Sequence, residues 1–276
     1  MQKPSPVLVV DRFPEILNAL LDLLTSLSAA DWERPTVAAG WTVKDITLHL
    51  LGDDIGLLSM KRDASTEPGM SISTWDELVA RINERNDAWV QAARRISPRL
   101  LCDLLRFTGD QASAYFRSLD PEALGRPISW AGPEPAPVWL DVAREFTERW
   151  YHQQHIRDAV GKPGLMEPHY LAPVLATFVH AIPQTYRQVD APQGTCLTLT
   201  ITGESGGSWS VLREEGRWQL YIGKPPQPHA EVELPEEAAW RVLTRGMTKD
   251  VARTQAVLLG DRALAVKMLE TISIIA

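Results

Sequence analysis

The hydrophobic periodicity of this 276-residue chain changes near Pro192. Before that point, apolar residues recur at three- and four-residue intervals, as in residues 11–28, which is the spacing of an amphipathic helix. After it, apolar and polar residues alternate, as in residues 196–202, which indicates a half-buried strand. The sequence therefore predicts an α+β protein in which a helical part precedes a smaller mixed part.

Spacing and capping patterns locate the individual elements. Thr42 with Asp45 three residues later predicts a capping box at the start of a helix, and Ser97-Pro98 predicts another start with proline in the first turn. The predicted helices are 11–28, 42–60, 74–96, 97–119, one through Glu148 that stops at Gly161, 168–187, 235–244 and 261–274. Residues 63–73 and 125–137 are rich in Pro, Gly, Ser or Thr and predict loops.

The predicted strands all lie in the last third of the chain. They cover residues 196–202, 209–213, 218–222, 230–234 and 256–259, and residues 214–217 predict a hairpin turn between the second and the third. We therefore expect two domains: a helix bundle over residues 1–165 and a small α+β domain over residues 166–276.

Composition excludes several classes of protein. The net charge of −7 and the pI near 5.4 argue against nucleic acid as the main partner. The chain lacks an apolar run near the roughly 18 residues of a membrane span, and the run at Val7–Val10 is too short for a signal peptide. Only two cysteines occur, Cys102 and Cys196, both in apolar surroundings that suggest structural roles. We expect a cytoplasmic protein without membrane or nucleic-acid partners.

One helix carries the pattern that points to chemistry. Glu148 and His152 are four residues apart, so they lie on one face and can close on one divalent metal ion. The best third ligand is His49, which the helix 42–60 places on a mostly apolar face that should point into the bundle. Two imidazoles and one carboxylate suit zinc with an open fourth position, although iron, nickel or manganese also fits.

Plainer interpretations remain open for each of these residues. Glu148 and His152 also fit a solvated ion pair, and His49 also fits a hydrogen-bonded core histidine. His155 is a rival ligand one turn further along the same helix. Asp53 is either a carboxylate that orients a ligand from the second shell or an ordinary exposed acid.

Two stretches resemble a known family. GWTVKDITLHL at residues 40–50 and FTERWYHQQHIRDA at residues 146–159 are similar to bundle helices of the mycothiol-dependent maleylpyruvate isomerase family, within the DinB-like superfamily. AAWRVLTRG at residues 238–246 and VLLGDRAL at residues 257–264 are similar to the sterol-carrier-like domain that ends those isomerases. The resemblance implies a DinB-like four-helix bundle followed by a sterol-carrier-like α+β domain.

The resemblance also implies a reaction. By position it implies a divalent metal, zinc foremost, on His49, Glu148 and His152, with mycothiol or another low-molecular-weight thiol as cosubstrate. The expected activity is an isomerase or S-transferase acting on a small unsaturated or electrophilic substrate such as maleylpyruvate. Two alternatives stay open: a metal-dependent hydrolase or lyase that uses metal-bound water, and a non-enzymatic small-molecule or lipid carrier. An anionic substrate needs a cationic clamp, and the C-terminal candidates are Arg213, Arg217, Arg241 and Arg245.

Overall fold

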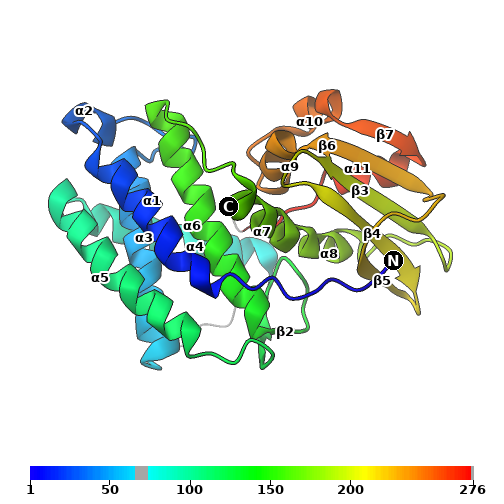
Figure 1. The fold of residues 1–276 in the computed structure, drawn as a ribbon, viewed down its shortest axis with the longest axis horizontal. Helices are drawn as coiled ribbons and strands as arrows, with labels where there is room; N and C mark the ends of the chain where they lie inside the picture. Colours follow the sequence, from blue (N-terminus) through cyan, green and yellow to red (C-terminus); the bar gives the residue numbers. More distant parts are fainter. Residues whose placement is uncertain (66–73, 275–276) are drawn as a thin grey trace. The chain divides into compact units, whose positions relative to one another are not determined.

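The computed structural model describes residues 1–65 and 74–274, and the chain forms two compact units (Figure 1). The helical unit contains Val9–Asp120 and Glu145–Leu165, and the sheet unit contains Met1–Leu8, Pro121–Arg144 and Met166–Ala276. The predicted α+β class is confirmed, because a helical N-terminal region precedes a C-terminal sheet. Residues 121–144 pack within the sheet unit, although the sequence places them in the first predicted domain. The boundary at residue 165 between two independently folding domains stays a prediction.

The helical unit is built from helices that begin where the sequence places caps. Thr42 and Thr74 each form a capping box, and Ser97 caps a helix that starts with Pro98. The elements are η1 (Val10–Arg12), α1 (Phe13–Thr25), α2 (Ala29–Trp32), α3 (Val43–Leu57), η2 (Leu58–Arg62), α4 (Trp75–Ala93), α5 (Pro98–Arg117) and, from Glu145 onward, α6 (Val138–Val160). The last of these helices ends at Gly161, whose φ of 66° terminates it as predicted.

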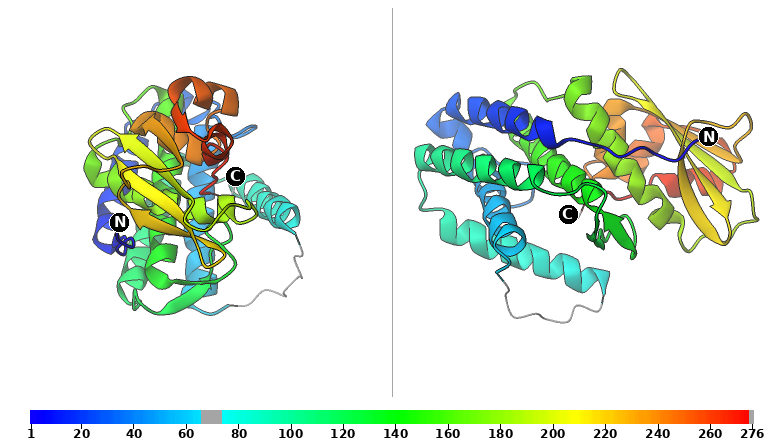
Figure 2. Two further views of the ribbon diagram at one scale, coloured as in Figure 1. Left: turned by 90° about the vertical axis from the view of Figure 1, so that its right-hand side faces the viewer. Right: turned by 60° about the horizontal axis from the view of Figure 1, so that its bottom comes forward.

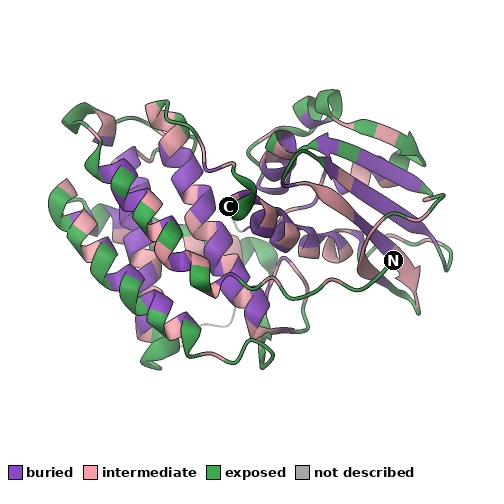
Figure 3. Cartoon of the chain, viewed as in Figure 1, coloured by how far each residue is buried: buried purple, intermediate pink, exposed green. Residues whose placement is uncertain are grey.

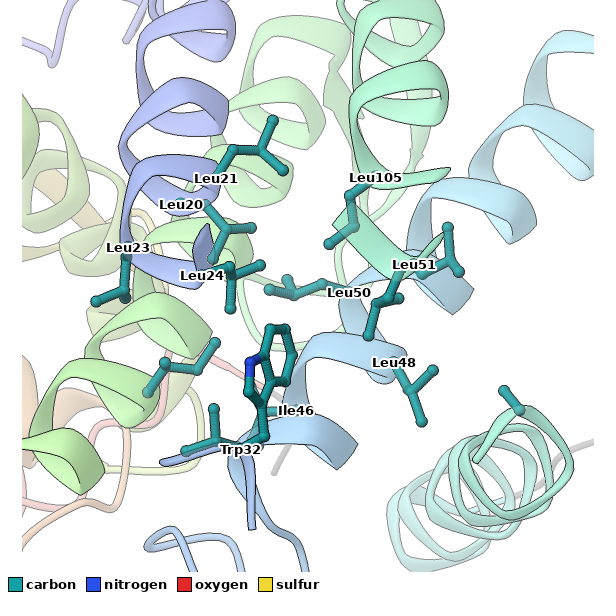
Figure 4. Packing of buried hydrophobic residues seen from close by; sticks show 14 of the residues in the cluster. Leu20, Leu21, Leu23, Leu24, Trp32, Ile46, Leu48, Leu50, Leu51 and Leu105 are labelled. Carbon is teal, nitrogen blue, oxygen red and sulfur yellow. The ribbon is translucent and has the colours of Figure 1, made fainter. Parts of the chain in front are cut away.

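A leucine-rich core holds these helices together. Leucines of α1 and α5 pack against the leucines of α3, and the Trp32 ring lies among them (Figure 4). Figure 3 shows buried stripes on the inner faces of the bundle helices and exposed residues on the outer faces. The core therefore fixes the rotation of α3 about its axis, which decides where the polar residues of that helix point.

One glycine brings α4 close to the helix that carries His49. A Cβ atom at Gly52 would lie 2.5 Å from Nε1 of Trp89, so only glycine admits the indole at this position. The indole Nε1 donates a hydrogen bond of 2.7 Å to the carbonyl oxygen of Leu48. This contact joins α4 to α3 next to the candidate site.

The sheet unit contains a five-stranded sheet with helices packed on it (Figure 2). The strand order is β5-β4-β3-β6-β7, and only β3 and β6 are parallel neighbours. The strands are β3 (Cys196–Thr202), β4 (Gly207–Glu214), β5 (Arg217–Ile222), β6 (Ala230–Pro235) and β7 (Val257–Gly260). The helical elements are α7 (Pro168–Phe178), η3 (Val179–Ala181), α8 (Ile182–Tyr186), α9 (Glu236–Leu243), α10 (Lys249–Gln255) and α11 (Arg262–Met268). The predicted hairpin turn is confirmed, with positive φ at Glu215 and Gly216 between β4 and β5.

Several predictions about elements were wrong or incomplete. The predicted loop 125–137 contains an antiparallel pair, β1 (Leu124–Pro127) and β2 (Pro135–Pro137), which proline-rich sequence hides because proline lacks a ladder donor. The predicted helix 168–187 is divided into α7, η3 and α8, with Pro183 in the first turn of α8. The short helices α2 and α10 were not predicted, and α11 ends at Met268 rather than near residue 274. Most of the predicted loop 63–73 lies outside the described residues.

Within residues 1–65 and 74–274, no helix is long and apolar enough to cross a lipid bilayer.

Candidate functional site

The two predicted histidines meet between α3 and α6. Nε2 of His49 lies 3.1 Å from Nε2 of His152, and the ring planes are inclined at 81°. These residues are 103 positions apart in the sequence, so the contact depends entirely on how the two helices pack. One Nε2 carries a hydrogen that the other accepts, unless a cation takes both lone pairs.

A carboxylate from the same helix accompanies each histidine. Oε2 of Glu148 lies 3.6 Å from Nε2 of His152, and Oδ2 of Asp53 lies 3.3 Å from Nε2 of His49. A carboxylate that orients a metal-binding histidine contacts the ring nitrogen that faces away from the metal position. Asp53 instead contacts the nitrogen that faces His152, so it lies inside the constellation and not behind it.

The contacts show that α3 and α6 run antiparallel here. His49 meets His152, and one turn further along α3 the charge of Asp53 interacts with that of Glu148, one turn back along α6. The following residue of α3, Asp54, lies 2.5 Å from Arg149. This register brings both carboxylates to the same end of the histidine pair.

Burial changes the acid–base properties of these groups. Burial raises the pKa of the Asp53 carboxyl to about 6, with His49 opposing the rise and the charges of Glu148 and Glu145 adding to it. Burial lowers the pKa of His152 well below its ordinary value, and His49 lowers it further. His152 is therefore neutral near pH 7, which leaves one ring nitrogen with a free lone pair.

A buried ion-pair network supports the site from the next helical positions. The Arg149 guanidinium bonds to Oδ1 of Asp54 at 2.5 Å and to Oε2 of Glu145 at 3.0 Å, and Thr108 donates to Asp54 at 2.9 Å. Burial disfavours the charged guanidinium, but Asp54 and Glu145 outweigh it and raise the pKa of Arg149. Sequence reasoning missed this network. The sequence signal that could have indicated it is the pair of consecutive acids, Asp53 and Asp54, on the helix that faces Glu148 and Arg149.

Aromatic rings surround the two histidines. The centroid of Trp41 lies 5.2 Å from that of His49, and Tyr151 lies 5.4 Å from His152. The rival ligand His155 is buried and packs edge-on against Tyr151, with centroids 4.1 Å apart. The nitrogen-to-nitrogen contact with His49 is thus made by His152, while His155 lies against the Tyr151 ring.

The other candidate residues lie elsewhere. Cys102 and Cys196 are both free thiols, and burial raises the pKa of each, which disfavours the reactive thiolate. Two of the four arginines proposed as clamps already have partners in the sheet unit. Arg213 donates to the carbonyl of Gly216, and Arg241 bonds to Glu237 at 2.8 Å.

The donor atoms can be compared with what a metal needs. Two donors about 2.0–2.1 Å from a tetrahedral zinc ion lie roughly 3.3 Å apart, and the three contacts of the constellation measure 3.1, 3.3 and 3.6 Å. In the described part of the chain, no group of three or more His, Cys, Asp or Glu side chains already stands in a metal-binding arrangement. An ion would have to draw these side chains onto a common centre, which their chemistry and spacing permit.

A family model decides the relationship. The model of the mycothiol maleylpyruvate isomerase N-terminal domain matches residues 13–157, which is more than half of the chain and includes α3 and most of α6. The chain belongs to this family. Among curated proteins, none matches the sequence.

Solved structures agree on the fold of this mycothiol maleylpyruvate isomerase family member. A crystal structure described as a histidine-to-alanine mutant of the mycothiol-dependent maleylpyruvate isomerase has 14% identity and a TM-score of 0.54, covering 90% of each chain. The structure described as that isomerase without the mutation has 14% identity and a TM-score of 0.51, covering 84% of this chain and 86% of the other. At this identity, the likeness shows the fold alone.

A third structure, sterol carrier protein 2 like 2 from Aedes aegypti, is 23% identical and covers 35% of this chain and 94% of its own. Its TM-score of 0.28 is too low to establish a shared fold.

Proposed function

We propose that this protein is a metal-dependent isomerase or S-transferase that uses a low-molecular-weight thiol, such as mycothiol, on a small unsaturated substrate of the maleylpyruvate type. The observation that carries the proposal is the contact of 3.1 Å between His49 and His152 with a carboxylate beside each ring. Membership of the mycothiol maleylpyruvate isomerase family supports the choice of thiol and substrate. The two free cysteines support a cytoplasmic setting for this chemistry.

His49, Glu148 and His152 would hold the metal. A bound divalent ion, zinc foremost, lowers the pKa of a thiol at an open position so that the sulfur is a thiolate near neutral pH. The protein itself keeps His152 neutral by burying it, which preserves a nitrogen lone pair for binding.

The surrounding residues hold and orient the groups that bind. Arg149 joins α6 to α3 through Asp54, so the helices cannot slide and separate His49 from His152 without breaking a buried ion pair. The rings of Trp41 and Tyr151 flank the histidines and restrict the water that reaches them.

The reaction requires no oxidant and no net proton. In the isomerisation, the thiolate sulfur forms a bond to one carbon of the conjugated cis double bond, and the π electrons move onto the conjugated carbonyl. The former double bond is then single and rotates. The electrons return, the C–S bond breaks, and the trans isomer leaves with the thiolate regenerated. An S-transferase would stop at the adduct or displace a leaving group instead.

A thiol-dependence assay tests the proposal. Purified protein loaded with zinc is incubated with maleylpyruvate in the presence of mycothiol, of glutathione or of no thiol, and formation of the trans isomer is followed by absorbance. We expect turnover only with thiol, and loss of turnover to background in His152→Ala. His169→Ala is the matched control, because His169 is an exposed histidine of the sheet unit.

Two outcomes would contradict the proposal. Turnover of an ester, amide or related substrate without thiol would indicate a hydrolase or lyase that uses bound water. Tight binding of an apolar ligand that survives His49→Ala, without any turnover, would indicate a carrier.

A further inference from the structure

We propose that Asp53 is a fourth protein donor to the same ion, so that two histidines and two carboxylates hold the metal and the thiol binds as a fifth ligand. This inference rests on the metal of the proposed function and extends its ligand set from three side chains to four. The new ligand lies on α3, one helical turn after His49.

The position of the Asp53 oxygen carries the inference. Oδ2 of Asp53 lies 3.3 Å from Nε2 of His49, which matches the roughly 3.3 Å between neighbouring donors on a tetrahedral zinc ion. The assigned carboxylate, Glu148, is further from its own histidine, at 3.6 Å. The distance from Asp53 to its histidine is therefore closer to the spacing of two zinc ligands than the distance from Glu148 to its histidine.

The symmetry of the two helices gives a second argument. On α3 the carboxylate follows its histidine by four residues, and on α6 the carboxylate precedes its histidine by four residues. Because the helices run antiparallel, these opposite orders bring Asp53 and Glu148 to the same end of the histidine pair. Each helix thus supplies one imidazole and one carboxylate.

Electrostatics explain what a cation would do there. The charges of Asp53 and Glu148 repel each other, and the nearby Arg149 guanidinium is engaged by Asp54 and Glu145. When His49 gives its Nε2 lone pair to an ion, that nitrogen carries no hydrogen toward the Asp53 oxygen 3.3 Å away. Asp53 would then be left beside the ion without a hydrogen-bond donor on His49, and direct ligation resolves this. Two carboxylates also neutralise a divalent ion, which a single carboxylate does not.

Metal affinity of the intact, metal-free protein tests the assignment. Zinc is titrated into wild type, Asp53→Asn and Asp110→Asn in competition with a chromophoric chelator. Asp110 is an exposed carboxylate of α5, so its variant controls for the loss of one charge. We expect Asp53→Asn to weaken zinc binding at least about tenfold, on the scale of losses seen around metal sites. Asp110→Asn should bind as wild type does.

Thermal unfolding of the metal-free variants separates ligation from a structural role. Removing a charge that Glu148 repels should leave the Tm of metal-free Asp53→Asn equal to that of wild type or higher. Asp53→Glu keeps a carboxylate and should recover part of the affinity. A Tm that falls while zinc affinity stays unchanged would show that Asp53 only stabilises the metal-free fold through its contact with His49, and would overturn the inference.

The failures of this inference and of the proposed function are distinguishable. Wild-type affinity in Asp53→Asn, together with lost affinity in His152→Ala, would remove Asp53 from the ligand set and leave the three-ligand site standing. Absence of zinc binding by wild type would overturn both.

Discussion

The two units of the molecule treat buried polar side chains differently. In the sheet unit they pair off with their strand neighbours: Thr198 meets Ser210 at 2.8 Å, and Thr200 meets Ser208 at 3.3 Å, each across the β3–β4 ladder. In the histidine cluster of the helical unit, by contrast, imidazole faces imidazole and carboxylate lies near carboxylate. The strand pairs form complete hydrogen bonds with each other, whereas under the proposed function a cation would complete the histidine cluster.

A histidine of the sheet unit with a buried ring nitrogen sharpens this contrast. His180 packs edge-on against Trp139, with centroids 5.4 Å apart, and its Nε2 is buried without a hydrogen-bond partner in the described residues. Burial lowers its pKa to about 4. A buried imidazole with a lowered pKa thus occurs in both units, and what distinguishes the candidate site is that several donors converge there.

The largest expected effect follows from breaking the network that supports the helix cluster. Arg149→Leu leaves the buried carboxylates of Asp54 and Glu145 without their cation, which should lower the free energy of unfolding by about 3–5 kcal/mol. Urea denaturation measures this loss. Arg81→Leu is the control, because it breaks an exposed pair with Glu84 worth at most about 1 kcal/mol. Equal small effects of both variants would refute a supporting role for Arg149.

Added zinc should stabilise the protein through His152 and not through His180. Zinc at a concentration about 100 times its Kd should add roughly 2.7 kcal/mol to the free energy of unfolding of wild type. The same gain is expected in His180→Leu, and none in His152→Ala. Differential scanning fluorimetry with and without zinc measures the shift in Tm. A zinc shift that disappears in His180→Leu would move the metal site into the sheet unit.

His180 should make the free energy of unfolding depend on pH. Because the folded state lowers the pKa of His180 from 6.5 to about 4, its unfolded state binds more protons below pH 6.5. Its contribution to stability is complete above about pH 6.5 and is lost as the pH falls toward 4. Metal-free His180→Leu should therefore lose about 2 kcal/mol less than wild type between pH 7 and pH 5 in urea denaturation. His169→Leu, at an exposed histidine, should keep the wild-type slope.

The smallest effect is expected for a strand pair. Thr198→Val removes one buried hydrogen bond to Ser210, whose own hydroxyl donates to the carbonyl of Gly223 at 2.7 Å. The loss should be about 1 kcal/mol, measured by urea denaturation. Thr200→Val, at the longer and less buried pair with Ser208, should cost less. A larger cost at Thr200 would contradict the view that the sheet unit pairs its polar groups locally.

Much of the fold could be predicted from residues with strong local preferences. The capping box at Thr42, the proline after Ser97 and the alternation along residues 196–202 each specify an element by local chemistry, and the structure contains all three. The β1–β2 pair could not be predicted, because Pro135 and Pro137 oppose strand structure and only packing within the sheet unit selects it. Short helices such as α2 contain too few residues to show periodicity.

The site was predictable only in part. Spacing along α6 puts Glu148 and His152 on one face, and the apolar neighbours of His49 direct it inward, so patterning predicts the candidate residues. Their contact across the two helices depends on packing. Rotation of the His49 ring decides which of its two nitrogens contacts Asp53, and sequence spacing does not encode that rotation. The ion pair of Arg149 with Asp54 depends on the register between the two helices, which is set by the leucine core.

Elemental analysis of the purified, untagged protein tests the central claim most directly. Wild type should contain about one zinc or other divalent transition metal ion per chain after reconstitution and dialysis, and His49→Ala, folded as judged by circular dichroism, should contain essentially none. A wild type without metal, or a His49→Ala protein with as much metal as wild type, would contradict the claim that α3 and α6 together form a metal centre.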